Sequence, residues 1–273
     1  MSAINTNVKS LVAQQALTVN NRSLSKAMAQ LSTGKRINSA ADDAAGLSIS
    51  NKMTAQVRGM QQAVRNTNDA ISMVQTVEGA LNEVTGMLQR MRELAVQSVN
   101  GTNSSADRVS LDTEFDQLAT EIARISDKTT WNGMTVSASA TTYTFQAGAD
   151  SADVVSVDFK DVNSSLNGMS DVSGGSVSTA AAATSSIAHV DNAISAVDAY
   201  RSSLGAMVNR LNYAADNLTN VSTNTAASRS RILDTDYAAT TTELARTQII
   251  QQAATAMLAQ ANQSPSSVLS LLQ

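Results

Sequence analysis

The sequence predicts a mainly α fold: a long antiparallel helical bundle or coiled coil, with a small β-hairpin and with the N- and C-terminal helices paired. Three observations predict it. Apolar residues recur at alternating steps of four and three along most of the chain, which is the spacing of one helix face. Only one proline occurs, and aromatic residues make up 3% of the 273 residues, so the large side chains of a typical globular core are scarce. One segment alternates apolar and polar residues with a period of two.

Three long helices are expected in the middle of the chain. The first spans about 45–99 and ends at Asn100-Gly101, because both residues tolerate the left-handed backbone that closes a helix. The second ends near Trp131-Asn132-Gly133, and the third spans about 180–228. Each carries an apolar face that only a neighbouring helix can cover, so the three should pack together. The predicted faces include Met53, Val57, Met60, Val64, Thr67, Ile71 and Val74, then Leu111, Phe115, Leu118, Ile122 and Ile125, then Ile187, Val190, Ile194, Val197, Leu204 and Leu211.

Between the second and third helices the pattern changes. Tyr143 and Phe145, and later Val155 and Val157, alternate with polar residues around a turn, which predicts a β-hairpin within about 134–165. Residues 164–186 are rich in Ser, Gly, Thr and Ala and are expected to form a flexible surface crossing.

The two ends of the chain are poor in charge, and residues 247–273 contain no charged residue. A soluble monomer seldom exposes such a segment, so we expect another surface to cover it. The predicted apolar seams of this terminal pair consist of Leu17, Leu24, Met28 and Leu31 near the N-terminus, and of Ile250, Ala254, Met257, Ala261, Val268 and Leu272 near the C-terminus.

Several function classes are disfavoured. A net charge of −4 argues against nucleic acid, and one histidine with no cysteine leaves no multi-histidine or thiolate metal site. No apolar run is long enough to span a membrane. Asp42 and Asp43, like Asp234 and Asp236, are interpreted as charges at helix starts. We therefore predict no enzyme activity and no catalytic, cofactor-binding or metal site. The residues alone show no cleavable secretion signal and would suggest a cytoplasmic protein.

Three segments resemble bacterial flagellin: LSTGKRINSAADDAAGLSIS at 31–50, QRMRELAVQSVNGTNS at 89–104, and the run from Ser230 to Gln273. The similarity covers most of residues 1–135 and 187–273. The resemblance implies a structural subunit that polymerises into the helical filament of the flagellum for swimming motility. It also implies a secreted, extracellular protein that leaves through the flagellar type III export apparatus. A hook–filament junction protein, and more remotely a signalling coiled-coil protein, remain the alternatives.

The resemblance also implies a domain organisation and a set of partners. Residues 1–43 with 229–273 would form an inner coiled-coil domain in the filament core, and 44–228 an outer helical domain. Only about 134–180 separates the two similar arms, so the chain looks like a minimal flagellin without the large variable outer domains. The implied partners are further copies of the chain, an export chaperone, the export apparatus, and the filament cap and hook-associated proteins.

One exposed surface is singled out by the resemblance. Residues Gln89, Arg90, Glu93, Leu94 and Gln97, with Glu114 on the next helix, are similar to the surface that vertebrate Toll-like receptors read in recognised flagellins. The same residues are expected to serve contacts between subunits. The resemblance also places Leu94 on this surface, and Leu81, Val84 and Leu88 are expected to supply the core instead.

Overall fold

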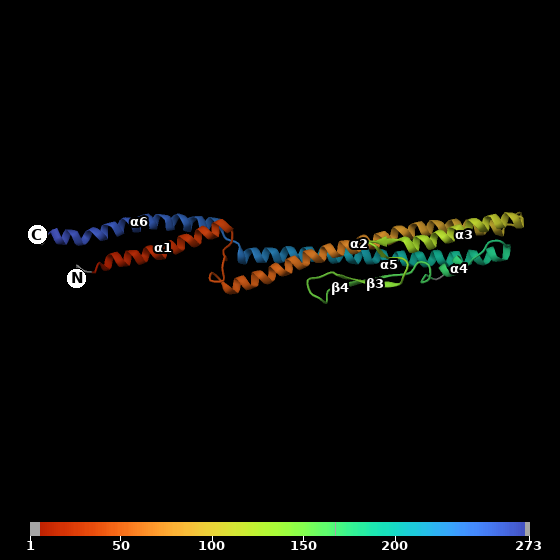
Figure 1. Cartoon of the computed structure of the whole chain (residues 1–273), viewed down its shortest axis with the longest axis horizontal. Coiled ribbons are helices and arrows are strands. Elements are labelled where there is room, and N and C mark those ends of the chain that lie inside the picture. Colours follow the sequence, from red (N-terminus) through yellow and green to blue (C-terminus); the bar gives the residue numbers. More distant parts are fainter. Residues whose placement is uncertain (1–5, 167, 271–273) are drawn as a thin grey trace. The chain divides into compact units, whose positions relative to one another are not determined.

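The computed structural model describes residues 6–166 and 168–270, with side chains as far as residue 263, and confirms a mainly helical fold with long helices and two small hairpins (Figure 1). The elements are α1 (Val8–Thr33), α2 (Ala44–Val99), α3 (Ser105–Lys128), β1 (Thr130–Trp131), β2 (Met134–Thr135), β3 (Thr141–Gln146), β4 (Val154–Phe159), α4 (Met169–Ser173), α5 (Ala180–Leu233) and α6 (Tyr237–Ser270). The predicted helix at 45–99 matches α2 to within one residue, whereas α5 continues past the predicted end at 228.

The chain divides into two compact units, which are described separately. The terminal unit contains residues 1–57 and 223–273, and the central unit contains residues 58–222. These limits fall inside α2 and α5, while the boundaries expected from the sequence lie near the ends of those helices. The assignment of inner and outer filament domains stays a prediction.

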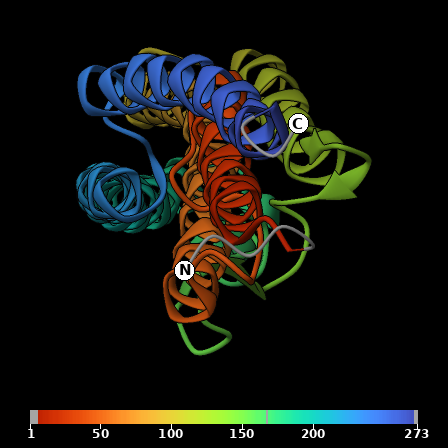
Figure 2. The ribbon, with the colours of Figure 1, turned by 90° about the vertical axis from the view of Figure 1, so that its left-hand side faces the viewer.

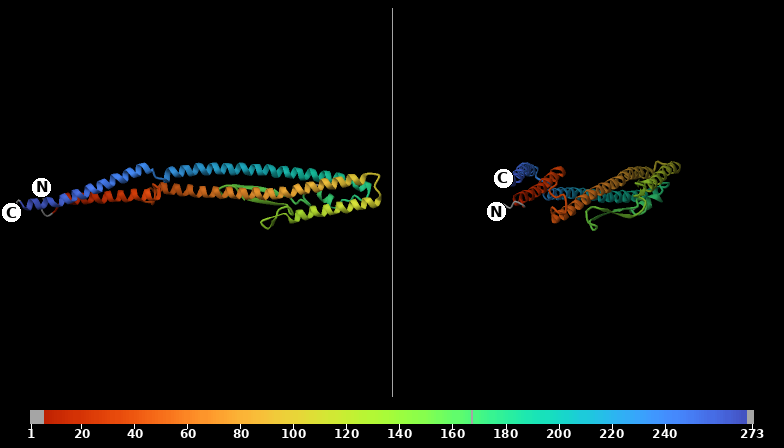
Figure 3. Two further views of the ribbon diagram at one scale, coloured as in Figure 1. Left: turned by 90° about the horizontal axis from the view of Figure 1, so that it is seen from above. Right: turned by 60° about the vertical axis from the view of Figure 1, so that its left-hand side comes forward.

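The central unit has one main core, to which α2, α3, β4, α4 and α5 all contribute. On α2 the buried residues Val74, Val77, Leu81, Val84, Leu88, Met91 and Ala95 alternate at steps of three and four. Phe115 and Ile122 from α3 and Val190 and Val197 from α5 close the same core, as their spacing predicted. Figure 3 shows α3 running beside the end of α2.

Leu94 was expected at the surface, and this expectation is wrong. Its side chain is 0% exposed and belongs to the core of the central unit. The expectation assumed that α2 has one narrow seam. Near its end, Met91, Leu94, Ala95 and Ser98 are all buried, so the buried face is a full helix face and is wider than the narrow seam of alternating four-three steps. Ser98 donates a hydrogen bond to the carbonyl of Val177, so the chain before α5 also covers this end of α2.

The predicted β-hairpin is formed by β3 and β4, which pair antiparallel with Tyr143 opposite Val157 and Phe145 opposite Val155. Val155, Val157 and Phe159 are buried, and the rings of Tyr143 and Phe159 meet edge to face at 5.6 Å. A second, very short hairpin of β1 and β2 was not predicted. Its two-residue loop is Asn132-Gly133, and both residues have positive φ, as a tight hairpin turn requires.

Residues 164–186 differ from the flexible surface crossing expected from their composition. Leu166, Met169, Val172 and Val177 are buried in the core of the central unit, and Met169 and Val172 belong to the short helix α4. The many small residues of this segment hide a few apolar anchors. The overall composition of the segment does not reveal these apolar residues, although each of them is buried in the core.

In the terminal unit, the chain between α1 and α2 is tied to the chain between α5 and α6. Gly34, with φ of 68°, ends α1, and its carbonyl accepts a hydrogen bond from the Thr235 N–H at 3.1 Å. Arg36 donates from its backbone to the Leu233 carbonyl at 2.7 Å and from its guanidinium to the Ile232 carbonyl at 2.8 Å. These bonds join two connections that lie about two hundred residues apart in sequence.

Asp43 and Asp236 confirm the interpretation of acidic residues at helix starts. The Asp43 carboxylate accepts from the N–H of Gly46 at 2.8 Å, and Asp236 accepts from the N–H of Ala238 at 2.9 Å. Gly46 is buried, and a methyl group there would collide with Asp43 and Ile37. Asp234 instead accepts from the hydroxyl of Ser230.

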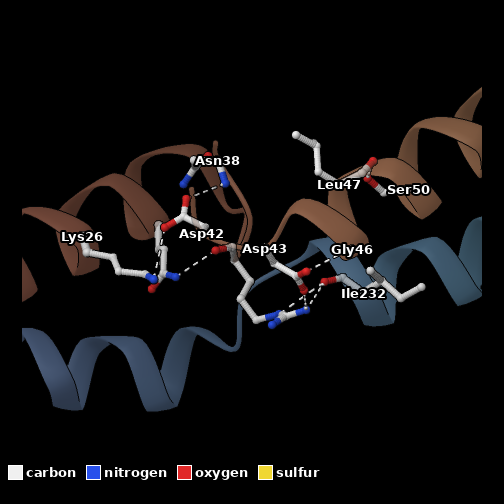
Figure 4. A network of polar contacts seen from close by, with 10 residues as sticks. Lys26, Asn38, Asp42, Asp43, Gly46, Leu47, Ser50 and Ile232 are labelled. Atoms are coloured by element: carbon white, nitrogen blue, oxygen red, sulfur yellow. Dashed lines mark hydrogen bonds and ion pairs between the residues drawn. The ribbon is translucent and has the colours of Figure 1, made fainter. Parts of the chain in front are cut away.

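Asp42, unlike Asp43, contacts α1 and the connection between α1 and α2 (Figure 4). Its carboxylate lies 3.1 Å from the Lys26 ammonium on α1 and accepts hydrogen bonds from the backbone N–H groups of Asn38 and Ser39. The Lys26 contact, followed by the backbone donors, lowers the pKa of Asp42 from 3.8 to about 2. Asp42 thus links the connection between α1 and α2 to the last part of α1.

We predict that Leu94→Ala destabilises the chain by about 2–5 kcal/mol, since it removes a fully buried side chain from a closed core. Val96→Ala, two residues further along α2 at a side chain that is 49% exposed, should change the free energy of unfolding by less than about 0.5 kcal/mol. Urea unfolding followed by circular dichroism compares the two. Equal unfolding midpoints for both variants would contradict the buried position of Leu94.

We also predict that Asp42 titrates near pH 2 in the folded chain, and that Lys26→Met raises its pKa toward 3.8 because the nearest cation is removed. Since the folded-state pKa is the lower one, the stabilisation by this carboxylate is complete above about pH 4 and is lost as the pH falls toward 2. Carbon-13 NMR of the carboxyl group measures the pKa. Lys52→Met, at an exposed position on α2, is the control and should leave it unchanged.

Candidate assembly and recognition surfaces

The terminal helices α1 and α6 run side by side and antiparallel (Figures 1 and 3). The Asn7 side chain donates to the Ala261 carbonyl at 2.7 Å near one end, and the Tyr237 hydroxyl donates to the Leu31 carbonyl at 3.1 Å near the other. Figure 2 views this pair along its length, from the end where α1 begins and α6 finishes.

The facing residues form one continuous seam with steps of three and four on both helices. They are buried or half-buried: Ser10, Ala13, Leu17, Asn20, Leu24, Ala27 and Leu31 on α1, and Thr240, Leu244, Thr247, Gln251, Ala254, Leu258 and Ala261 on α6. This is the geometry of a coiled coil, in which a strict seven-residue repeat keeps one face toward the partner. We call this set the terminal seam.

Polar residues fix the register of the terminal seam. Asn20 is buried and donates from its side-chain amide to the Thr247 carbonyl at 2.8 Å. The Ser10 hydroxyl donates to the side-chain oxygen of Asn262 at 2.9 Å. A one-turn slip of α1 along α6 would break both bonds, so the seam has one preferred alignment. A search restricted to apolar residues could not find these positions.

The structure places five of the predicted seam residues in the terminal seam, namely Leu17, Leu24, Leu31, Ala254 and Ala261, all half-buried. Their burial within one chain does not test the predicted role in the filament core.

Met28, Ile250 and Met257 lie outside the terminal seam with their side chains exposed. Within a single chain they lie at the edge of the contact between α1 and α6 or outside it, although the spacing grouped them with its centre. The side chain of Val268 and the whole of Leu272 lie outside the described residues.

A shallow groove runs along one side of the pair, lined by Val12 and Val19 of α1 and Ile250 of α6 among polar neighbours such as Asn20 and Thr247. Met257 follows Ile250 by seven residues and so shares its face of α6. We call Val12, Val19, Ile250 and Met257 the outer groove face. All four are exposed, which is unusual for apolar side chains that share one helix pair.

The second candidate surface lies on the central unit, where Gln89, Arg90, Glu93 and Gln97 of α2 and Glu114 of α3 are exposed. We call these five residues the Arg90 patch. The Arg90 guanidinium lies 3.0 Å from Glu93 and 2.9 Å from Glu114, and these contacts, Glu93 first, raise its pKa further. Arg90 thereby holds two carboxylates of different helices in fixed positions.

Arg92 connects this charged surface to α5. It forms an ion pair with Asp191 of α5 at 2.6 Å, and this partner raises the pKa of the guanidinium. Arg92 also lines a shallow groove with Glu93, Val96 and Gln97. No local sequence signal could reveal the pairing with Asp191, because the two residues lie in separate helices with the hairpin segment between them.

The part of the chain that the structure describes contains no cluster of three or more His, Cys, Asp or Glu side chains able to hold a metal ion. Among the described helices, none combines the length and the hydropathy of a membrane span.

Comparison with known proteins shows the family of the chain. Residues 4–142 match the bacterial flagellin N-terminal helical region, and residues 187–272 match the bacterial flagellin C-terminal helical region. A flagellin of Halalkalibacterium halodurans is 46% identical over 271 residues, with 99% of each chain covered. Flagellin B of Vibrio cholerae is 36% identical over 98% of this chain and 99% of its own. That alignment spans 371 positions, so the Vibrio protein has residues without a counterpart in these 273.

Solved structures agree with the sequence comparison. The crystal structure of Bacillus cereus flagellin is similar with a TM-score of 0.51 at 33% identity, and the match covers 60% of this chain and 94% of that one. A putative flagellar hook-associated protein of Vibrio parahaemolyticus shares the fold, with a TM-score of 0.59 and 71% and 100% coverage, at only 12% identity. The chain belongs to the bacterial flagellin family and is a structural subunit of the flagellar filament.

Proposed function

We propose that the terminal pair of α1 and α6 joins subunits into the filament, and that the outer groove face is covered there by further copies of this chain. The observation that carries the proposal is the exposure of Val12, Val19, Ile250 and Met257 on helices whose terminal seam is already occupied. A filament subunit meets many copies of itself, so a second apolar face has a ready partner.

The chemistry of the terminal pair fits this occupant. Burying one Val, Ile or Met side chain contributes about 1.5–3 kcal/mol, and every subunit of a filament repeats the contact. Past Arg246 no charged residue remains on α6, so no ion has to be desolvated when a neighbour docks against its last turns. The central unit, by contrast, buries Leu81, Leu88, Phe115 and Leu204 in its own core, and its exposed apolar residues, such as Met134 and Tyr213, lie apart on different elements.

We place the working protein outside the cell, in the flagellar filament, with the type III apparatus and an export chaperone as its route. The filament cap and hook-associated proteins complete the proposed partners. Family membership supports these assignments. A hook–filament junction role has weaker support, since the likeness to the hook-associated protein is one of fold, whereas the likeness to flagellins extends over the whole sequence. Nothing favours a signalling coiled coil or an enzyme.

We also propose a role for the Arg90 patch. Its five residues are exposed in the monomer, and Arg90 fixes the carboxylates of Glu93 and Glu114. A rigid charged surface of this kind suits a lateral contact between subunits and also suits recognition of the monomer by a vertebrate Toll-like receptor. Leu94 is not included, because its side chain is buried.

We predict that Val19→Glu and Ile250→Glu each prevent elongation from short filament seeds, because a carboxylate would lose its water in a largely apolar contact, and Arg246, the cation that lines the groove, is already paired with Glu243. Both positions are exposed in the monomer, so its helical content should be retained. Gln252→Glu, exposed on the same helix, adds the same charge away from the groove and should elongate. Negative-stain microscopy and light scattering measure the result. Normal filaments from both groove variants would show that the outer groove face is not an assembly contact.

We predict that Arg90→Ala weakens filaments and lowers receptor activation by the monomer, while thermal unfolding of the monomer stays nearly unchanged because exposed ion pairs contribute little to stability. Arg124→Ala is the matched control, since Arg124 forms an exposed ion pair with Glu121 outside the patch. Swimming, filament shearing and a receptor reporter assay are the measurements. If both variants behave alike in all of them, the patch has no special role.

A further inference from the structure

The described methionines fall into three groups, of which Met53, Met87 and Met207 form the half-buried one. Met60, Met73, Met91 and Met169 are buried. Among the described methionines the large exposed fractions belong to Met257 at 66%, Met28 at 56% and Met134 at 43%. Two of these three lie on the terminal helices, and Met257 lies on the outer groove face.

We infer that Met28 and Met257 are oxidation sites, and that their conversion to methionine sulfoxide by a peroxide stops the monomer from joining a filament until a sulfoxide reductase reverses it. The inference rests on the proposed assembly role of the terminal pair. It adds a covalent modification and a class of reactant that the assembly role by itself does not contain.

The chemistry requires only the thioether and the oxidant. The sulfur lone pair attacks one oxygen of hydrogen peroxide, the O–O bond breaks, and an S–O bond forms. Sulfur loses two electrons, and the second peroxide oxygen takes both protons and leaves as water. The rate depends on how freely the oxidant reaches the sulfur, so Met28 and Met257 should react before the buried methionines.

The product is incompatible with an apolar contact. A thioether is flexible and apolar, whereas a sulfoxide carries a strong hydrogen-bond acceptor. Met257 lies seven residues after Ile250, so its sulfoxide would enter the contact proposed for the outer groove face without a donor to satisfy it. In the monomer the same oxygen would face water, so oxidation should block assembly while leaving the fold intact.

Met28 gives the terminal pair a second reactive position. It follows the buried Ala27 on α1 but points out of the terminal seam. Met134, in the short strand β2 of the central unit, has similar exposure and the same chemistry without belonging to the terminal pair. It is therefore a control that the chain itself supplies.

The experiment oxidises full-length monomer with dilute hydrogen peroxide, locates sulfoxides by peptide mass spectrometry, and measures elongation from unoxidised filament seeds. The wild type should lose elongation rate roughly tenfold or more once Met28 and Met257 are converted, as an unpaired polar group in the contact requires. Methionine sulfoxide reductases of both stereospecificities should restore the rate. Circular dichroism should show unchanged helical content.

Matched variants separate this inference from the proposed function. The double variant M28L/M257L, which keeps apolar side chains of similar size, should elongate normally before and after peroxide. M134L should remain as sensitive as the wild type. If oxidised wild type elongates normally, or if M28L/M257L loses elongation like the wild type, the inference is overturned. Either result, combined with failed elongation of Val19→Glu and Ile250→Glu, would leave the proposed assembly role standing.

Discussion

Each long helix of this chain depends on a neighbour to cover its apolar face. With few aromatic residues, no cysteine and no metal cluster among the described residues, the packing of helix seams carries most of the stability. The central unit meets this need internally, since Leu81, Leu88, Phe115 and Leu204 are all fully or almost fully buried. The terminal unit meets it only in part. Its seam contains Ser10, Asn20 and Thr247, and its remaining apolar side chains stay in contact with solvent.

Periodicity predicted the long helices well, because a repeat sustained over many turns has no competing interpretation. The start of α2 and the alternation along β4 came out as expected. The same argument failed where one helix has more than one neighbour. Spacing gives the direction of a face but not its width, so it did not contradict the surface position that the resemblance implied for Leu94, whose side chain is buried.

The terminal pair shows a different limit of sequence reasoning. Both Leu24 and Met28 fit a seven-residue pattern, and nothing in their spacing tells which of them meets α6 and which faces outward. Polar residues decide the register here, and an apolar pattern cannot reveal them: Asn20 donates to a backbone carbonyl that becomes available only once α6 lies alongside. Ion pairs between distant segments, such as that of Arg92 with Asp191, are equally invisible before the fold is known.

A polymer subunit must fold before it assembles and yet leave a surface for assembly, and these demands oppose each other if one core serves both. In this chain they fall on different residues. The closed core of the central unit needs no partner, and its exposed charges are held in pairs around Arg90 and Arg92. The terminal helices bury one face, whose register is fixed by polar side chains, and leave a second, apolar face exposed. Because Asn20, rather than further leucines, fixes the register, the open face keeps a defined geometry, and its apolar side chains stay available for the proposed contact with a neighbouring copy.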